Sequence, residues 1–141
     1  IGILSAIGLN QFSGVREKAR DAERKNDLVQ ISRALLFYFD DFDTYPDNDD
    51  DDPGEDDYEF GNPAIDGGVW LAAIKGTYLS PVPVDPVSSD VMPCSYRYKR
   101  TDVKQYQLVA TLESNEKSRL CSTNATLCNN AATDHCWCTQ P

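Results

Sequence analysis

The sequence predicts an α+β fold in which one long N-terminal helix packs through its C-terminal half on a small antiparallel sheet. Three observations predict it: an uncharged, largely apolar opening, a following segment with apolar residues every three or four positions, and two alternating segments near residue 100. A chain of 141 residues is one ordinary domain at most. We divide it into an assembly helix, residues 1–44, and a globular head, residues 45–141.

The opening, residues 1–14, has no charged side chain. It is too short to span a bilayer alone, but it suits the inner end of a longer apolar helix. Because a helix that is apolar on all sides must be buried by something, we expect this part to make assembly contacts. The residues expected to make them are Ile3, Leu4, Ile7, Leu9 and Phe12.

A charged stretch, residues 15–26, continues the same helix with nearly balanced charges. For any single residue here, a solvated helix surface is the favoured interpretation. Asp21 and Lys25 stand at the i,i+4 spacing that supports a helix. We expect Arg16, Asp21 and Lys25 to add charge pairs between subunits.

The last part of the helix is amphipathic. A single apolar stripe, which should face the head, is formed by Leu28, Ile31, Leu35, Tyr38 and Phe42. Pro46 cannot donate to the backbone ladder and disfavours the helical conformation at Tyr45, so it is expected to end the helix.

An acidic run follows at residues 47–59 and is predicted to form a self-repelling loop. Its oxygens could bind Ca²⁺, but the run lacks the register and the closing Glu of an EF-hand. A solvated loop is favoured, and no cofactor is expected.

The rest of the head is predicted from shorter signals. Residues 69–76 read as a short helix with a stop at Gly76, followed by a link punctuated by prolines. Residues 95–100 and 105–112 alternate apolar with polar side chains. They predict two antiparallel strands joined by residues 101–104.

Five cysteines fall in the last 48 residues: Cys94, Cys121, Cys128, Cys136 and Cys138. Four of them lie in a tail with little periodicity, where disulfides would supply order that apolar burial cannot. A metal site is the rival interpretation, but the spacing fits no standard zinc motif. Disulfides and an extracytoplasmic location are therefore favoured. The connectivity and the partner of the odd cysteine stay open.

Charge and motifs argue against two function classes. The net charge of −10, without a basic patch, disfavours binding to nucleic-acid phosphates. The single histidine, His135, stands next to Cys136, and adjacent residues seldom adopt a productive nucleophile–base geometry. The sequence has no phosphate-binding glycine loop or nucleophile elbow, so we do not expect an enzyme.

Several segments together resemble one family. They are IGILSAIGLNQF at 1–12, ARDAERKNDL at 19–28, the Tyr45-Pro46 stop, YLSPVPVDP at 78–86, and the two strands with Tyr96, Tyr98, Tyr106 and Leu108. This pattern resembles type IV pilins and the major pseudopilins of type II secretion over residues 1–112. The resemblance implies a pilin-like fold and a membrane-anchored precursor that inner-membrane machinery assembles. The product would be an extracellular helical homopolymer at the cell surface, with the apolar helices at its centre.

The chain departs from the family pattern in three places. The usual start, a Phe with a nearby Glu in the apolar segment, is missing, so about a dozen residues are expected before Ile1. Asn10 stands where many members have a helix-breaking proline. The cysteine-rich tail occupies the region of the pseudopilin calcium loop.

Two alternatives to a pilus subunit remain. One is a type II secretion pseudopilin. The other is a minor pilin that acts as a tip adhesin or binding module, for which Trp70 and Trp137 are the candidate contacts, although Trp70 fits a core position better.

Overall fold

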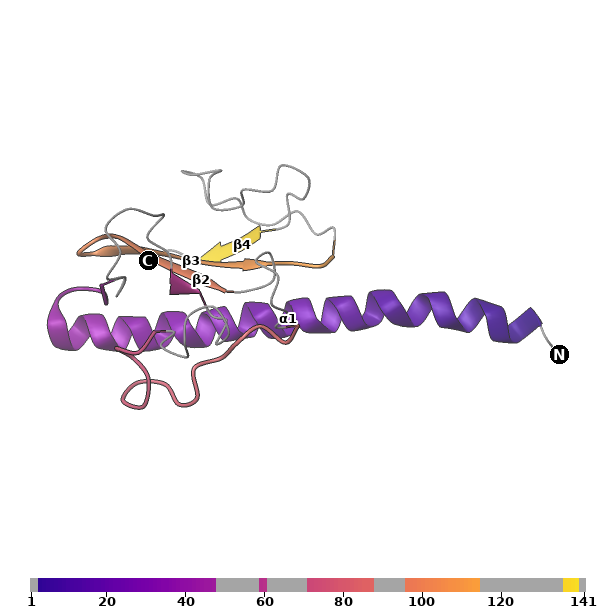
Figure 1. The fold of residues 1–141 in the computed structure, drawn as a ribbon, viewed down its shortest axis with the longest axis horizontal. Coiled ribbons are helices and arrows are strands. Elements are labelled where there is room, and N and C mark those ends of the chain that lie inside the picture. Colours follow the sequence, from indigo (N-terminus) through magenta and orange to yellow (C-terminus); the bar gives the residue numbers. More distant parts are fainter. Residues whose placement is uncertain (1–2, 48–58, 61–70, 88–95, 115–135, 140–141) are drawn as a thin grey trace.

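A computed structural model describes residues 3–47, 59–60, 71–87, 96–114 and 136–139 of the chain. These residues form one helix, α1 (Ile3–Phe42), and four strands: β1 (Glu59–Phe60), β2 (Arg97–Asp102), β3 (Gln105–Thr111) and β4 (Cys136–Thr139). Figure 1 shows α1 lying along one side of the sheet. The predicted α+β arrangement, with a long helix on a small antiparallel sheet, is confirmed.

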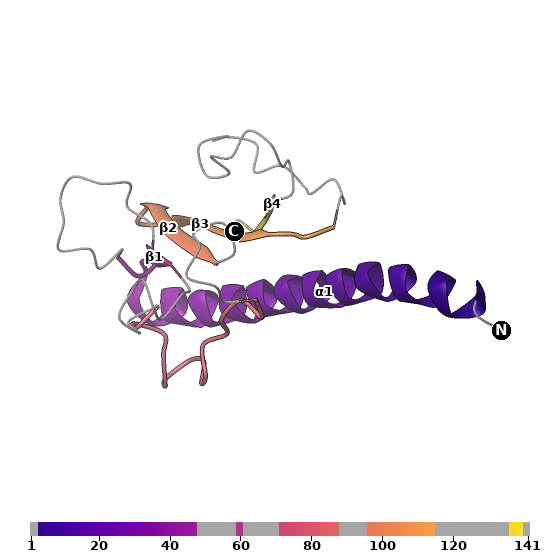
Figure 2. The same ribbon diagram turned by 45° about the vertical axis from the view of Figure 1, so that its right-hand side comes forward.

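The helix is much longer than the sheet it packs against. Its 40 residues span about 60 Å at 1.5 Å per residue. Figures 1 and 2 show that its N-terminal part extends beyond every strand, while its C-terminal part lies beside the sheet. We call residues 3–13 the stalk. The predicted single helix over residues 1–44 is confirmed from Ile3 to Phe42.

The apolar stripe of α1 faces the sheet, with one exception. Leu28, Ile31 and Leu35 are fully buried, because their spacing of three and four places them on one side of the helix. Phe42, predicted to belong to this stripe, is instead 58% exposed, and its ring packs against that of Tyr38 at 4.5 Å between centroids. The stripe therefore ends one turn early, since the chain turns away immediately after Phe42.

The helix ends before the predicted stop. Asp43 adopts a left-handed conformation with φ of 55°, and its N–H donates to the carbonyl of Phe39 at 2.8 Å. Asp and Asn tolerate this conformation better than most residues, so Asp43 terminates the helix three residues before Pro46. Tyr45 and Pro46 are buried and hold the following corner: the Tyr98 hydroxyl donates to the Pro46 carbonyl at 2.8 Å.

The strands form one antiparallel sheet in the order β1-β2-β3-β4. The predicted hairpin is confirmed, although its loop is shorter than 101–104: β2 extends to Asp102, which pairs with Gln105, and leaves only Val103 and Lys104 between the strands. The predictions did not include β1 or β4. The latter comes from the cysteine-rich tail and pairs with β3.

Both faces of β3 are buried. Tyr106, Leu108 and Ala110 belong to the core, as their alternation predicts. Gln107 and Val109, on the opposite face, are also only 6% and 3% exposed. β3 is therefore buried on both faces, and within the sheet it lies between β2 and β4.

The segment predicted to be a short helix, residues 69–76, forms turns in its described part, residues 71–76. Leu71 has φ of 47°, and a right-handed helix cannot pass through this conformation. Gly76, the predicted stop, has φ of 83°. The turns still bury Leu71 and Ile74 against the stripe of α1. Residues 69 and 70 of this element, the second of which is Trp70, lie outside the described residues. Of the acidic run, only Asp47 and Glu59 are described, and Glu59 lies on β1.

Candidate functional site

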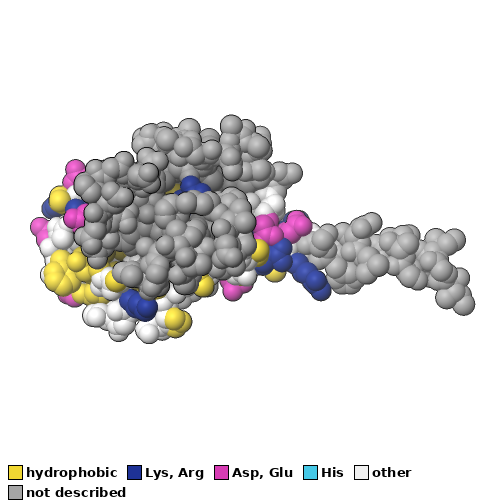
Figure 3. Space-filling model, viewed as in Figure 1, with side chains coloured by type: hydrophobic (Ala, Val, Ile, Leu, Met, Phe, Trp, Pro, Cys, Tyr) yellow, Lys and Arg dark blue, Asp and Glu magenta, His cyan; other side chains and the backbone are white. Residues whose placement is uncertain are grey.

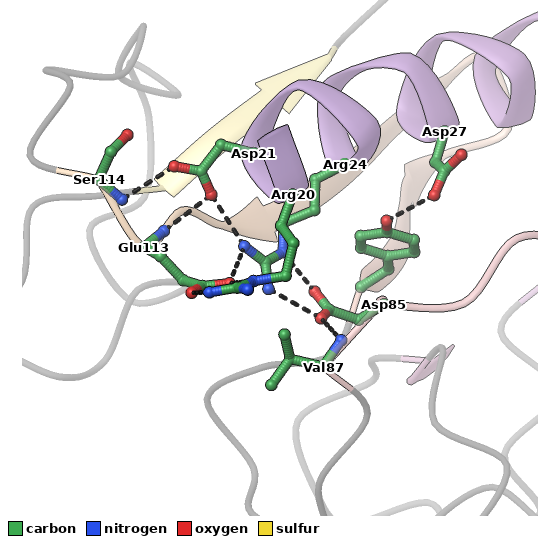
Figure 4. A network of polar contacts seen from close by, with 9 residues as sticks. Arg20, Asp21, Arg24, Asp27, Asp85, Val87, Glu113 and Ser114 are labelled. Carbon is green, nitrogen blue, oxygen red and sulfur yellow. Dashed lines mark hydrogen bonds and ion pairs between the residues drawn. The ribbon is translucent and has the colours of Figure 1, made fainter. Parts of the chain in front are cut away.

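A buried arginine lies on α1 eleven residues after the end of the stalk. Arg24 projects from α1 and is 1% exposed. Its Nε donates to Oδ2 of Asp85 at 2.8 Å, and a terminal nitrogen donates to Oδ1 of the same carboxylate at 3.0 Å. Its other terminal nitrogen donates to Oδ1 of Asp21 at 2.8 Å and lies 2.7 Å from Oε1 of Glu113. Figure 4 shows the guanidinium enclosed by these three carboxylates.

The planar guanidinium explains why an arginine occupies this position. It presents five donors in a fixed fork, so it can bind one carboxylate at two points and still reach two others. Burial alone would lower the pKa of Arg24, but the hydrogen bonds to Asp85 and Glu113 raise it, so the charge is retained.

Asp21 joins the helix to the end of β3. Besides Arg24, its carboxylate accepts hydrogen bonds from the backbone N–H groups of Glu113 at 2.9 Å and Ser114 at 2.8 Å. Burial opposes ionisation, yet the hydrogen bonds from Ser114, Glu113 and Arg24 hold the pKa of Asp21 below its ordinary value. Asp21 therefore pairs two backbone N–H groups that lie just beyond the end of β3.

Arg20 also belongs to this network. We define the network as Arg20, Asp21, Arg24, Asp85 and Glu113. Arg20 binds both carboxylate oxygens of Glu113, with Nε at 2.8 Å from Oε1, and this lowers the pKa of Glu113. Asp85 also accepts the N–H of Val87 at 2.9 Å. The network therefore links α1, the 71–87 segment and the end of β3 (Figure 4).

One turn further along α1, Oδ2 of Asp27 accepts a hydrogen bond from the Tyr96 hydroxyl, with 2.8 Å between the two oxygens. Burial raises the pKa of Asp27 above its ordinary value, although the hydrogen bond from Tyr96 acts in the opposite direction. Burial and the bond to Asp27 also raise the pKa of Tyr96. Both groups thus belong to the joint between helix and sheet.

The structure corrects one expectation about the charged stretch. A solvated surface was predicted, and Arg16 and Lys18 are indeed exposed, but Asp21 and Arg24 are 2% and 1% exposed. Asp21 and Arg24 form hydrogen bonds and ion pairs inside the head, because Asp85 and Glu113 approach them from other segments of the chain. Lys25 is half-buried. Asp21 thus holds its own chain together, whatever it contributes between chains.

The other predicted site residues fall at the margins of the described structure. Ile3, Leu4, Ile7, Leu9 and Phe12 lie on the stalk, whose backbone is helical and whose side chains are outside the described residues. Cys94, Cys121 and Cys128 also lie outside them. Cys136 and Cys138 occupy positions on β4 opposite Thr111 and Val109. No disulfide prediction is tested.

Sequence reasoning missed Asp85, Glu113 and the role of Arg24. A weak signal existed for Asp85, an acid set between Val84 and Pro86 in an otherwise uncharged, proline-rich link. Glu113 follows a predicted strand, and no feature of the neighbouring sequence indicates that it pairs with α1.

The network is a structural joint rather than a reactive centre, since each of its carboxylates is engaged by arginine or by backbone N–H donors. Among the described residues, no three His, Cys, Asp or Glu side chains are grouped so that they could hold a metal ion. The acidic run that could bind calcium is almost entirely outside them. In the same part of the chain, no helix has the length and apolarity needed to cross a membrane.

Comparison of the chain with protein-family models, with curated proteins and with solved structures finds no significant match.

Proposed function

We propose that this chain is a structural subunit of an extracellular type IV pilus-like filament, which polymerises through its stalk. The observation that carries the proposal is the continuity of α1: one helix of 40 residues packs on the head and then extends beyond every strand, and the extension is the uncharged, apolar opening of the sequence. An uncharged, apolar helical extension must be buried by something other than its own head. It is what an assembly subunit needs.

The joint around Arg24 supports the same proposal. A stalk transmits force to its head only if the two are firmly connected where the helix leaves the sheet. Arg24 and Asp21 lie at that point and link three segments of the chain through buried, charge-assisted hydrogen bonds. The head and the helix should therefore move as one body.

Apolar packing should set the strength of assembly. Burying each large stalk side chain is worth about 1.5–3 kcal/mol, whereas exposed ion pairs contribute about 0–1 kcal/mol each. Identical subunits whose stalks meet in a helical bundle would bury these side chains. In this proposal the partners are other copies of the chain and the inner-membrane machinery that assembles a membrane-anchored precursor.

The test is made in the native cells with the full chain. Filaments sheared from the surface are imaged by negative stain, and mass spectrometry determines whether this chain dominates them. Ile7→Asp should abolish the filaments and leave the head folded, because Ile7 lies on the stalk. The matched control is Val103→Asp, which places the same charge on a 52% exposed apolar residue of the hairpin loop and should leave filaments unchanged.

Absence of this chain from surface filaments would contradict the proposal. So would normal filaments in the Ile7→Asp strain, or a head unfolded by that substitution.

A further inference from the structure

The solvent-facing side of α1 becomes apolar near its C-terminal end. Leu36 and Phe37 are 57% and 60% exposed, and neither belongs to the stripe that packs on the sheet. Figure 3 shows hydrophobic side chains gathered at the end of the head opposite the stalk, with acidic side chains beside them. Large exposed apolar residues that are bordered by charged groups are typical of a surface that contacts a partner.

Two carboxylates lie one turn beyond these side chains. Asp40 follows Phe37 by three residues and Asp41 follows it by four, and helix positions with these spacings are neighbours on the helix surface. Both aspartates are exposed. The Phe37 ring therefore lies next to two negative charges.

A second segment of the chain holds one of these carboxylates in place. The Tyr78 hydroxyl donates to Oδ2 of Asp41 at 2.5 Å, and the Tyr78 ring packs edge-on against that of Tyr38, with 5.8 Å between the ring centroids. The hydrogen bond uses one of the two carboxylate oxygens, and Asp41 remains exposed. Its charge is thus positioned on the surface before any partner arrives.

This end of the head has a surplus of negative charge. Asp43 and Asp47 have Lys104 and Arg100 as cationic partners, but the two carboxylates next to the Phe37 ring form no ion pair with a described residue. The chain then continues into the acidic run, residues 47–59. A partner whose charge complements this surface is therefore cationic.

We propose that this face of α1, formed by Leu36, Phe37, Asp40 and Asp41, docks an arginine-containing segment of a partner protein. We call it the Phe37 face. A guanidinium can stack on the aromatic ring and bind the adjacent carboxylates through its N–H donors. Lysine is a poorer match, because its ammonium group lacks the planar fork that stacks and binds carboxylates at two points. The inference goes beyond the filament function and does not depend on it.

Arg33 borders the Phe37 face on the side of the stalk. It is exposed and precedes Phe37 by four residues, so its guanidinium can reach the same ring. A cation brought by a partner therefore competes with Arg33 for the ring, whereas Asp40 and Asp41 attract that cation from the other side. Removal of the Arg33 charge should strengthen docking.

A synthetic peptide tests the proposal on the full, dispersed chain. The probe is a fluorescein-labelled peptide of sequence GRLGRLG, and fluorescence anisotropy measures its dissociation constant. The control peptides carry lysine, or citrulline as the uncharged analogue of arginine, at both arginine positions. The arginine peptide should bind about threefold or more tightly than the lysine peptide, and the citrulline peptide should not bind. Equal binding of the arginine and citrulline peptides would overturn the proposal.

Variants of the chain locate the binding site. Phe37→Ala and Asp40→Asn should each weaken binding of the arginine peptide about threefold or more, because each removes one of the proposed contacts. Arg33→Gln should strengthen it about twofold or more. The matched controls are Phe42→Ala, at a phenylalanine that is 58% exposed, and Asp102→Asn, at an exposed aspartate of β2. Both controls should leave binding unchanged, and circular dichroism should be the same for all five variants.

Three further results would overturn the proposal. If the controls weaken binding as much as Phe37→Ala and Asp40→Asn do, the peptide responds to the overall negative charge rather than to the Phe37 face. Unchanged or weaker binding by Arg33→Gln would remove the ring as the contact. If the wild type does not bind the arginine peptide, the proposal is wrong, and loss of filaments in the Phe37→Ala strain would then assign this face to contacts between copies of the chain. The filament function is tested separately by Ile7→Asp.

Discussion

The carboxylate of Asp85 binds the guanidinium of Arg24 at two points, 2.8 and 3.0 Å, and both side chains are 1% exposed. The two residues are 61 positions apart and come from different segments of the chain. Because neither charge has access to water, each depends on the other for its solvation. Four predictions concern this joint and the core beside it, and a fifth concerns the cysteine-rich tail.

Removing the buried arginine should be strongly destabilising. Arg24→Met leaves Asp85 and Asp21 buried without their cation, so the free energy of unfolding should fall by about 3–5 kcal/mol. Arg16→Met, at an exposed position without an ion pair among the described residues, should change it by no more than about 0.5 kcal/mol. Urea unfolding of the full chain measures both. In the chain that also carries Asp85→Asn, the loss should be smaller than the sum of the two single losses.

Asp21 should make the stability depend on pH in the acid range. Its folded pKa lies below the ordinary value of 3.8, so its contribution is complete above that pH and is lost as the pH falls through the folded value. Glu113 acts in the same direction, and Asp27, whose pKa is raised, acts in the opposite one. The difference in unfolding free energy between wild type and Asp21→Asn should therefore be large at pH 6 and shrink on acidification. A difference independent of pH would contradict the assignment.

Tyr96 should control the acidity of Asp27. Its hydroxyl stabilises the ionised carboxylate, so Tyr96→Phe should raise the Asp27 pKa further. Carbon-detected NMR titration of the side-chain carboxyl reports the change. The control is Tyr98→Phe, which removes a hydroxyl bonded to the Pro46 carbonyl and should leave the Asp27 titration where it is. A shift in the control of the same size would show that the effect is not local.

Truncation of two adjacent leucines on α1 should reduce the free energy of unfolding by very different amounts. Leu35 is fully buried and Leu36 is 57% exposed. Leu35→Ala should cost about 2–5 kcal/mol of unfolding free energy, whereas Leu36→Ala should cost no more than about 0.5 kcal/mol in the dispersed chain. Thermal or urea unfolding distinguishes them. Equal losses would mean that the buried face of the helix is assigned incorrectly.

The cysteine-rich tail should contain disulfides. Peptide mapping of native, unreduced protein should find Cys136 or Cys138 bonded to Cys94, Cys121 or Cys128, because the tail offers little apolar surface to order it. The pairing of β4 with β3 gives the tail a place in the sheet, and a covalent bond there would hold the strand in register. Recovery of five free thiols would favour the metal-site alternative instead.

The sequence by itself determined the elements whose signal is local. The spacing of Leu28, Ile31 and Leu35 determined which side of α1 is buried, because a helix repeats every 3.6 residues wherever it occurs. The alternation around Tyr98 and Leu108 determined the hairpin in the same way. These patterns depend on neighbours a few positions away, so they can be read without the rest of the chain.

Only the tertiary structure decided the fate of the charged residues. Asp21 and Arg24 look like any other pair on a solvated helix, and they are buried because Asp85 and Glu113 arrive from 61 to 92 residues away. The exposure of Phe42 was decided similarly, by the direction in which the chain leaves Asp43. Burial of a charge depends on which partners other segments bring to it, and a local pattern carries no information about those partners.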